Sequence, residues 1–191
     1  MIDVSSVPLS DPLKILIGAG DQRWAGWLLT QKEQLDLLTP EDWSASFRGR
    51  LVDAFLCEHV WEHLTEAQGQ AAAWLCFDYL KPGGLLRCAV PDAHFPDPIY
   101  QATAQVGGPG PSDHPAADHK TAYDYRRFCD VFTSAGFQVD LLEYCDESGR
   151  FHYNQWSVES GPIYRSLLLD HRNRDGRIGF VSLIVDAKKP L

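Results

Sequence analysis

The sequence contains 191 residues, of which 45% are hydrophobic, and this is enough to form the buried core of one domain. Its formal net charge of −9 at pH 7 would repel the backbone of a nucleic acid, and the Lys and Arg residues form no cluster that offsets this charge. No apolar run reaches the ~18 residues that a membrane span requires. We therefore expect no nucleic-acid partner and no membrane association.

The cysteines and the first residues of the chain bear on the cellular compartment. The five cysteines lie mostly among apolar residues and form no Cys-x-x-Cys pair, which indicates reduced thiols rather than a disulfide framework. Residues 1–12 are polar and contain two prolines, without the basic and apolar regions of a signal peptide. We expect a cytoplasmic protein with a single domain over residues 1–191, of which residues 1–12 form a leader.

The first predicted strand, at residues 14–17, ends in the glycine turn Gly18-Ala19-Gly20. Glycines at such a turn let the backbone approach a ligand closely, although one Gly-x-Gly alone is weak evidence for a nucleotide-like ligand. The following residues, 21–26, are too few for a complete crossover helix. One face of the sheet would then be under-covered, which favours a homodimer. Further strands are predicted at residues 27–30, 35–38 and 51–57.

A helix follows the strand at residues 51–57. Thr65 and Gln68 have the spacing of a capping box, which predicts that the helix begins there. The helix leads to Leu-Lys-Pro-Gly-Gly at residues 80–84, where the proline stops a helix and the glycines permit a sharp reversal.

The next element, residues 85–90, is a mostly apolar run, which predicts a central strand covered on both faces. Asp92 comes just after the carboxyl end of this strand, where open α/β sheets bind their ligands. Residues 93–120 are rich in proline and contain His119. Because so long a connection within a compact domain is usually functional, we expect it to form a lid.

The last part of the chain predicts a helix at residues 121–135 and strands at 137–144 and 180–187. The alternation of strands and helices predicts an α/β fold with a doubly wound, mostly parallel sheet. No crossover helix is apparent between the last two strands. We therefore expect them to pair antiparallel at one edge of the sheet.

The order of these elements resembles that of class I S-adenosylmethionine-dependent methyltransferases, and most closely their small bacterial members with a shortened N-terminal half. The resemblance covers nearly the whole chain and depends on the glycine turn, on His-Val-x-Glu-His-Leu at residues 59–64, on Leu-Lys-Pro-Gly-Gly and on the terminal strand. It implies a Rossmann-like sheet and S-adenosylmethionine as the cofactor. It also implies methyl transfer to a hydroxyl or amine of a small-molecule substrate.

The resemblance assigns residues to the cofactor site. The matching positions are Gly18, Ala19 and Gly20 for the glycine turn, Asp36 for the acid near the adenine, and Cys57, Glu58 and His59 for the segment after the fourth strand. In the family an acid after the second strand holds the ribose hydroxyls, but here Gln31 stands at that position. Its amide is a neutral and weaker acceptor than a carboxylate. This departure leaves a second function open, in which the chain has lost productive cofactor binding and serves as a partner-binding or structural subunit.

Three residues are candidates for catalysis. His59 and Asp92 follow central strands at the carboxyl edge of the sheet, and His119 closes the long loop. A general base is needed when the methyl acceptor is a hydroxyl. His119 has an equally weighted structural interpretation, in which it caps the following helix.

Residues 59–63 also spell His-x-x-Glu-His, the reverse of a zinc-protease motif. A zinc site would need both histidines on one helical face and a third ligand further along the chain. Because the motif lies at a strand end, before the helix begins, we expect packing and cofactor contact there and no metal site.

Overall fold

The computed structural model describes residues 2–108, 114–174 and 176–191. These residues form a seven-stranded sheet in the order β2-β1-β3-β4-β7-β5-β6. The strands are β1 (Lys14–Ile17), β2 (Leu28–Leu29), β3 (Val52–Glu58), β4 (Leu80–Pro91), β5 (Gln138–Cys145), β6 (Phe151–Tyr153) and β7 (Ser182–Lys188). The helices are α1 (Pro40–Phe47), α2 (Glu66–Tyr79), α3 (Pro98–Ala104) and α4 (Tyr125–Thr133), and short 3-10 turns are η1 (Val4–Ser6), η2 (Trp61–His63), η3 (Pro115–Asp118) and η4 (Val158–Ser160).

The predicted α/β fold is confirmed. Strands β2, β1, β3 and β4 are parallel to one another, and β7 is antiparallel to both β4 and β5. The edge strand β6 also pairs antiparallel with β5. The capping box forms as predicted, since Thr65 Oγ1 accepts from Gln68 N at 3.3 Å and Gln68 Oε1 accepts from Thr65 N at 3.0 Å.

Two predicted elements are wrong. Residues 35–38 form turns instead of a third strand, because Asp36 bends the backbone toward α1: its Oδ1 accepts from Leu38 N at 2.8 Å and its carbonyl accepts from Trp43 Nε1 at 2.9 Å. Residues 80–84 are the first part of β4 instead of a tight turn, since Gly83 N donates to Lys189 O at 2.9 Å. Strand β6 was not predicted.

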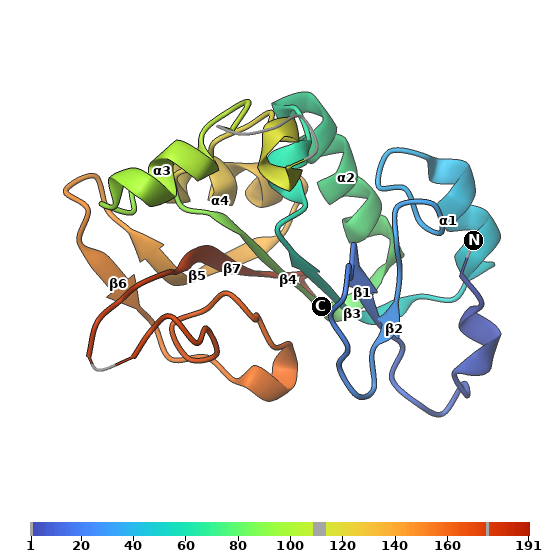
Figure 1. Cartoon of the computed structure of the whole chain (residues 1–191). Helices are drawn as coiled ribbons and strands as arrows, with labels where there is room; N and C mark the ends of the chain where they lie inside the picture. The colour runs from blue at the N-terminus through green and yellow to red at the C-terminus, as the bar shows by residue number, and fades with distance from the viewer. Residues whose placement is uncertain (1, 109–113, 175) are drawn as a thin grey trace.

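The sheet buries a different set of side chains on each face. Phe55 and Cys57 of β3 belong to the core beneath α1, α2 and α4, all of which Figure 1 shows on one side of the sheet. Ala54 and Leu56, one residue out of step, belong to the core on the opposite face. Burial on both faces is the pattern expected of central parallel strands.

The opposite face is covered by residues 154–181, of which 175 lies outside the described residues; they connect β6 to β7, and Figure 1 shows the described ones below the sheet, in orange to red. Their Trp156 and Ile163 are buried against Leu16 and Leu56. This face is therefore not open, although it lacks a helix among the described residues. The homodimer was expected because one face of the sheet was predicted to be under-covered, and that argument no longer supports it. The homodimer stays a prediction.

Glu143 of β5 holds residues 154–181 by two hydrogen bonds. Its Oε1 accepts from Trp156 Nε1 at 2.9 Å, and its Oε2 accepts from Leu167 N at 2.8 Å. Glu143 is fully buried, and this burial raises the pKa of its carboxyl to about 7.

We expect Glu143 to make stability depend on pH. A carboxyl with a higher pKa in the folded state binds its proton more tightly there, so its contribution is complete below about pH 4.5 and is lost as the pH rises through about 7. The wild-type protein should lose roughly 3 kcal/mol relative to Glu143→Gln between pH 5 and pH 8. Urea unfolding of both proteins at the two pH values measures this, and a difference independent of pH would contradict it.

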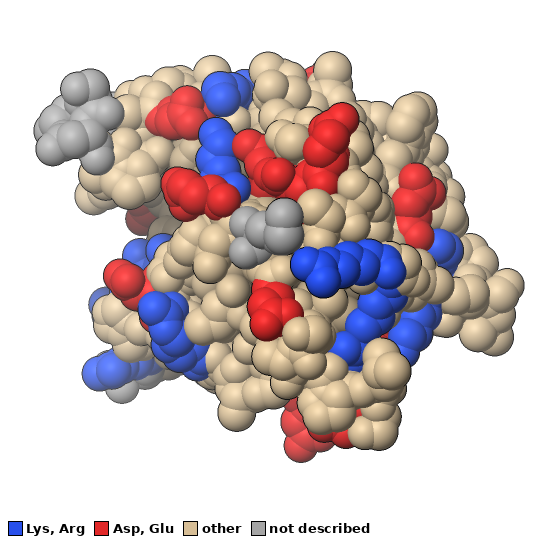
Figure 2. Space-filling model, turned by 90° about the vertical axis from the view of Figure 1, so that its right-hand side faces the viewer, with Lys and Arg blue, Asp and Glu red and all other residues tan. Residues whose placement is uncertain are grey.

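The surface carries charges of both signs. On the face with the N-terminus and α1, Figure 2 shows Lys and Arg side chains interspersed with Asp and Glu. The net charge of −9 is therefore not concentrated there as a single acidic patch.

None of the helices in the described part of the chain has the length and apolar character needed to cross a membrane. All five cysteines are free.

Candidate functional site

The carboxyl ends of β1, β3 and β4 meet at one edge of the sheet, because these strands are parallel. This edge carries the glycine turn after β1, the pair Glu58 and His59 at the end of β3, and Asp92 just after β4. The fold thus brings together the candidate residues that follow the central strands.

The two glycines of the turn have different environments. Both have positive φ, +61° at Gly18 and +51° at Gly20, which favours glycine. A Cβ on Gly18 would lie 2.6 Å from Val60 Cγ2, whereas a Cβ on Gly20 would have no atom within 4 Å. Gly18 is therefore required for packing, and Gly20 borders open space that a ligand can enter.

Gln31 is bonded to this turn. Its Oε1 accepts from Gly20 N at 3.2 Å, and its Nε2 donates to Gly20 O at 2.9 Å. Gln31 is thus next to the glycine turn, and its assignment to the ribose position stays a prediction. Its amide is already engaged by the backbone. Glu33, the nearest carboxylate in sequence, is exposed.

Asp36 and Cys57 have mainly structural surroundings. Asp36 stabilises the turn that precedes α1, as described above. The thiol of Cys57 is buried with Cys76 and Cys88 in the core beneath the helices. The Cys57 thiol therefore points into the core, and only the backbone of this residue could contact a cofactor at the end of β3. The assignment of Cys57 to the cofactor site stays a prediction.

Glu58 is buried and accepts four hydrogen bonds. Oε2 accepts from Gln22 Nε2 at 3.0 Å and Tyr164 N at 2.7 Å, while Oε1 accepts from Arg165 N at 2.9 Å and Arg165 Nη1 at 3.2 Å. Burial raises the pKa of this carboxyl. Glu58 therefore ties the end of β3 to residues 154–181.

Asp92 is fully buried at 0% exposure. Its Oδ1 accepts from His94 N at 2.8 Å and its Oδ2 from Cys145 N at 2.6 Å. Burial raises its pKa. Because both oxygens are held by backbone amides away from solvent, the structure does not present Asp92 to a substrate, and we assign it to joining β4 to β5.

His59 lies between two polar side chains. Its Nε2 is 2.8 Å from Ser182 Oγ and its Nδ1 is 3.4 Å from Glu62 Oε1. The residue has φ +56°, and Phe180 stacks on its ring at 6.3 Å between centroids. Burial holds the pKa of His59 well below its usual value and raises the pKa of Glu62 to about 8. No pattern in the sequence pointed to Ser182, which is 123 residues from His59.

His119 lies on the other side of Glu62. Residues 93–120, the predicted lid, contain α3 and η3, and their part at 109–113 lies outside the described residues. His119 follows η3 and meets His63 edge to face at 5.0 Å between ring centroids. Burial lowers the pKa of both histidines. His119 is 8% exposed and lies beside η2. It does not cap α4, whose N-cap is Asp124.

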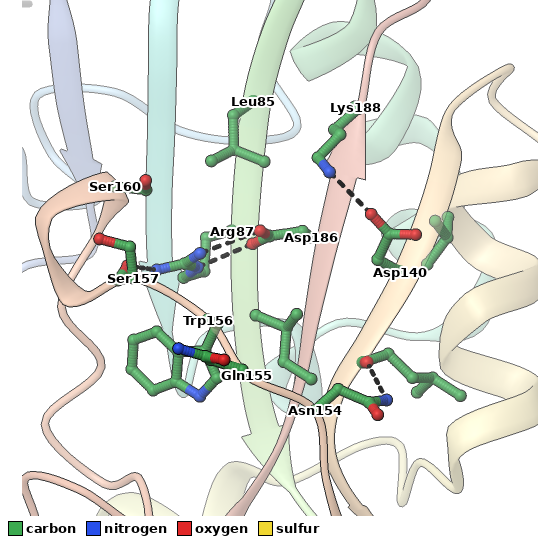
Figure 3. A pocket seen from close by; sticks show the side chains of 13 residues that line it. Leu85, Arg87, Asp140, Asn154, Gln155, Trp156, Ser157, Ser160, Asp186 and Lys188 are labelled. Atoms are coloured by element: carbon green, nitrogen blue, oxygen red, sulfur yellow. Dashed lines mark hydrogen bonds and ion pairs between the residues drawn. The ribbon is translucent and has the colours of Figure 1, made fainter.

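A cavity of about 530 Å³ lies elsewhere, on the face covered by residues 154–181. Figure 3 shows Arg87 of β4 in it, pointing toward Asp186 of β7, with Trp156 nearby. None of the predicted site residues lines this cavity. This cavity is therefore distinct from the candidate site at the carboxyl edge.

Comparisons with known proteins show which solved structures share this fold. No protein-family model matches the sequence, and no curated protein matches it detectably. Among solved structures, a SAM-dependent methyltransferase from Archaeoglobus fulgidus has a TM-score of 0.54 and 13% identity over 94% of this chain and 87% of its own. One from Methanosarcina mazei has a TM-score of 0.53 and 10% identity over 98% of this chain and 97% of its own.

This chain has the class I methyltransferase fold. The TM-scores establish the likeness of fold. At identities of 10–13% this likeness does not carry the activity over, and the activity has to be argued from the site residues. In the class I methyltransferase fold of this chain, the glycine turn, Gln31 and His59 lie at the carboxyl edge of the sheet, where open α/β sheets place their ligands.

Proposed function

We propose that this chain binds S-adenosylmethionine at the carboxyl edge of the sheet and transfers its methyl group to a hydroxyl or amine of a small molecule. The observation that carries this is the glycine turn after β1, where Gly20 borders open space in a class I methyltransferase fold. When bound, the cofactor supplies an electrophilic methyl group. The chain has to hold the cofactor and orient the acceptor.

The residues near the turn fit this cofactor with an amide in place of a carboxylate. Gln31 lies against Gly20 and is the polar side chain that would hold the ribose hydroxyls. An amide accepts a weaker hydrogen bond than a carboxylate does. Glu58 accepts four hydrogen bonds from its own chain, whereas Gln31 gives Gly20 only one of its two N–H donors and one of its two lone pairs, so Gln31 would contribute more to cofactor affinity.

A second function is favoured by the same two side chains. Gln31 and Glu58 are both satisfied internally, which is the arrangement expected if the fold no longer holds a cofactor. The chain would then act as a partner-binding or structural subunit.

Thermal unfolding with S-adenosylmethionine and with S-adenosylhomocysteine separates the two functions. A ligand at about one hundred times its dissociation constant adds ~2.7 kcal/mol to the stability of the folded state. For a domain of this size the midpoint should rise by roughly 5–10 °C. Absence of any rise at millimolar concentration of both ligands would reject the methyltransferase function.

Substitution of Gln31 tests its role directly. We expect Gln31→Ala to weaken S-adenosylmethionine binding by about 5–10-fold, which corresponds to one neutral hydrogen bond. Gln31→Glu should tighten binding, because a carboxylate accepts from the ribose diol more strongly. Isothermal titration measures both, with Gln138→Ala, an exposed glutamine at the start of β5, as the control. Equal affinities in all four proteins would place the ribose elsewhere.

A further inference from the structure

The end of the long loop is fastened to η2. Lys120 N and Thr121 N donate to Glu62 O at 2.7 and 3.1 Å, and Thr121 Oγ1 donates to Leu64 O at 2.7 Å. These bonds place His119 beside His63. His119, 56 positions after His63 in the chain, thus brings a second imidazole to Glu62 and His63, while His59 of the motif stays outside this group.

Glu62 is a buried carboxylate without a hydrogen bond. The residue is 2% exposed, and neither Oε1 nor Oε2 has a hydrogen-bond partner among the residues that the structure describes. His59 Nδ1 lies 3.4 Å from Oε1, without the geometry of a hydrogen bond. Burial of an unpartnered carboxylate is costly and rare in folded proteins, so a ligand for its oxygens is expected.

The two neighbouring histidines each have one nitrogen turned to an acceptor. His119 Nδ1 lies 3.1 Å from Ala104 O, and because a carbonyl only accepts, this bond requires the proton on Nδ1 and leaves a lone pair on Nε2. His63 Nδ1 lies 3.8 Å from Asp118 Oδ2, beyond hydrogen-bond distance, but the negative charge of this carboxylate favours a proton on Nδ1. A metal-bound histidine typically donates its other ring N–H to a carbonyl or carboxylate in this way.

We propose that Glu62, His63 and His119 bind a divalent transition-metal ion, with Zn²⁺ the ion of choice. One carboxylate and two imidazoles are a ligand set of zinc sites that keep a fourth position for water. Imidazole ligands disfavour Mg²⁺ and Ca²⁺. No residue of this set belongs to the glycine turn, although His59, one of the residues assigned to the cofactor, lies 3.4 Å from Glu62 Oε1.

The geometry needs only side-chain adjustment. One ligand atom from each of the three residues lies within 4.8 Å of the others. Ligand atoms of a tetrahedral zinc site lie about 3.4 Å apart, given Zn–N and Zn–O bonds of about 2.0–2.2 Å. His63 is the ligand with room to move, since its side chain is 28% exposed, and it also provides the route by which the ion enters.

The experiment uses the full chain without an affinity tag, stripped with a chelator and titrated with ZnCl₂ by competition against a chromophoric chelator. We expect one Zn²⁺ per chain with a dissociation constant at or below ~1 µM. Glu62→Gln, His63→Asn and His119→Asn should each weaken binding at least ~100-fold. The matched control is His171→Asn, because His171 also lies near an acid, 3.8 Å from Asp170, but is 63% exposed and lacks the other ligands.

Two further readouts keep the result independent of folding and of methyl transfer. Co²⁺ should give visible absorption bands of a four-coordinate site in the wild type and not in His63→Asn, a variant at a partly exposed position that should fold. The wild-type unfolding midpoint should rise by about 5–10 °C with Zn²⁺ at one hundred times its dissociation constant. Binding that persists in His63→Asn and His119→Asn, or no binding at micromolar Zn²⁺, would overturn the metal site. The S-adenosylmethionine titrations would still decide the proposed function.

Discussion

Replacement of Arg87 by methionine should lower the free energy of unfolding by about 3–5 kcal/mol. Arg87 is 1% exposed on β4 and forms a bidentate pair with Asp186, at 2.7 Å from Nε to Oδ1 and 2.9 Å from Nη2 to Oδ2. Its Nη1 also donates to Ser157 O at 2.7 Å and Gly161 O at 2.6 Å. The variant leaves a buried carboxylate and two carbonyls without their donor, and it removes one of the attachments of residues 154–181 to the sheet.

Urea unfolding of Arg87→Met and of Lys188→Gln measures this difference. Lys188 pairs with Asp140 at 2.7 Å one strand away, but both side chains are more than half exposed. Exposed pairs contribute about 0–1 kcal/mol, so Lys188→Gln should hardly change the free energy of unfolding. A loss in Arg87→Met no larger than that in Lys188→Gln would show that the buried pair does not hold this segment.

Gly18→Ala should destabilise the protein by roughly 2–5 kcal/mol. The positive φ of +61° costs an alanine about 1–2 kcal/mol. The new Cβ would also lie 2.6 Å from Val60 Cγ2, and such overpacking typically costs a further ~1–3 kcal/mol.

Gly20→Ala is the matched control. Its φ of +51° carries the same backbone cost of about 1–2 kcal/mol, but its Cβ would meet no atom within 4 Å. We expect Gly20→Ala to fold and to bind S-adenosylmethionine more weakly, because its methyl group stands where the cofactor is proposed to lie. If calorimetry found the two variants equally stable, packing against Val60 would not be the role of Gly18.

Local signals in the sequence predicted the frame of the fold. The Thr65 and Gln68 capping box, the glycine turn after β1 and the apolar run in β4 each act within a few residues, so their structures could be read without knowledge of the rest. Residues 35–38 have the apolar character of a strand, but Asp36 bonds to its neighbours and turns the chain into α1. The hydrogen bonds of Asp36 thus outweighed the strand propensity of residues 35–38.

The site was predicted less well because its contacts join distant residues. Gly18, Gly20, Gln31 and His59 lie at the carboxyl edge, as their positions after strands require. The roles of Glu58 and Asp92 depend on their hydrogen bonds to Tyr164 N and Cys145 N. The hydrophobic periodicity of the sequence cannot predict contacts between residues so far apart in the chain. His119 reaches Glu62 only because the long loop is bonded to η2.

The bonds from Glu58 to the backbone amides of Tyr164 and Arg165 have a thermodynamic consequence. Any ligand that uses this carboxylate must compete with the chain's own amides. Its apparent dissociation constant is therefore the intrinsic one divided by the fraction of molecules in which residues 164–165 have left Glu58, so its affinity is lowered. Every contact that fastens this segment elsewhere, Arg87 with Ser157 and Gly161 included, lowers that fraction. A destabilising substitution far from the edge would then tighten ligand binding there, without touching the ligand.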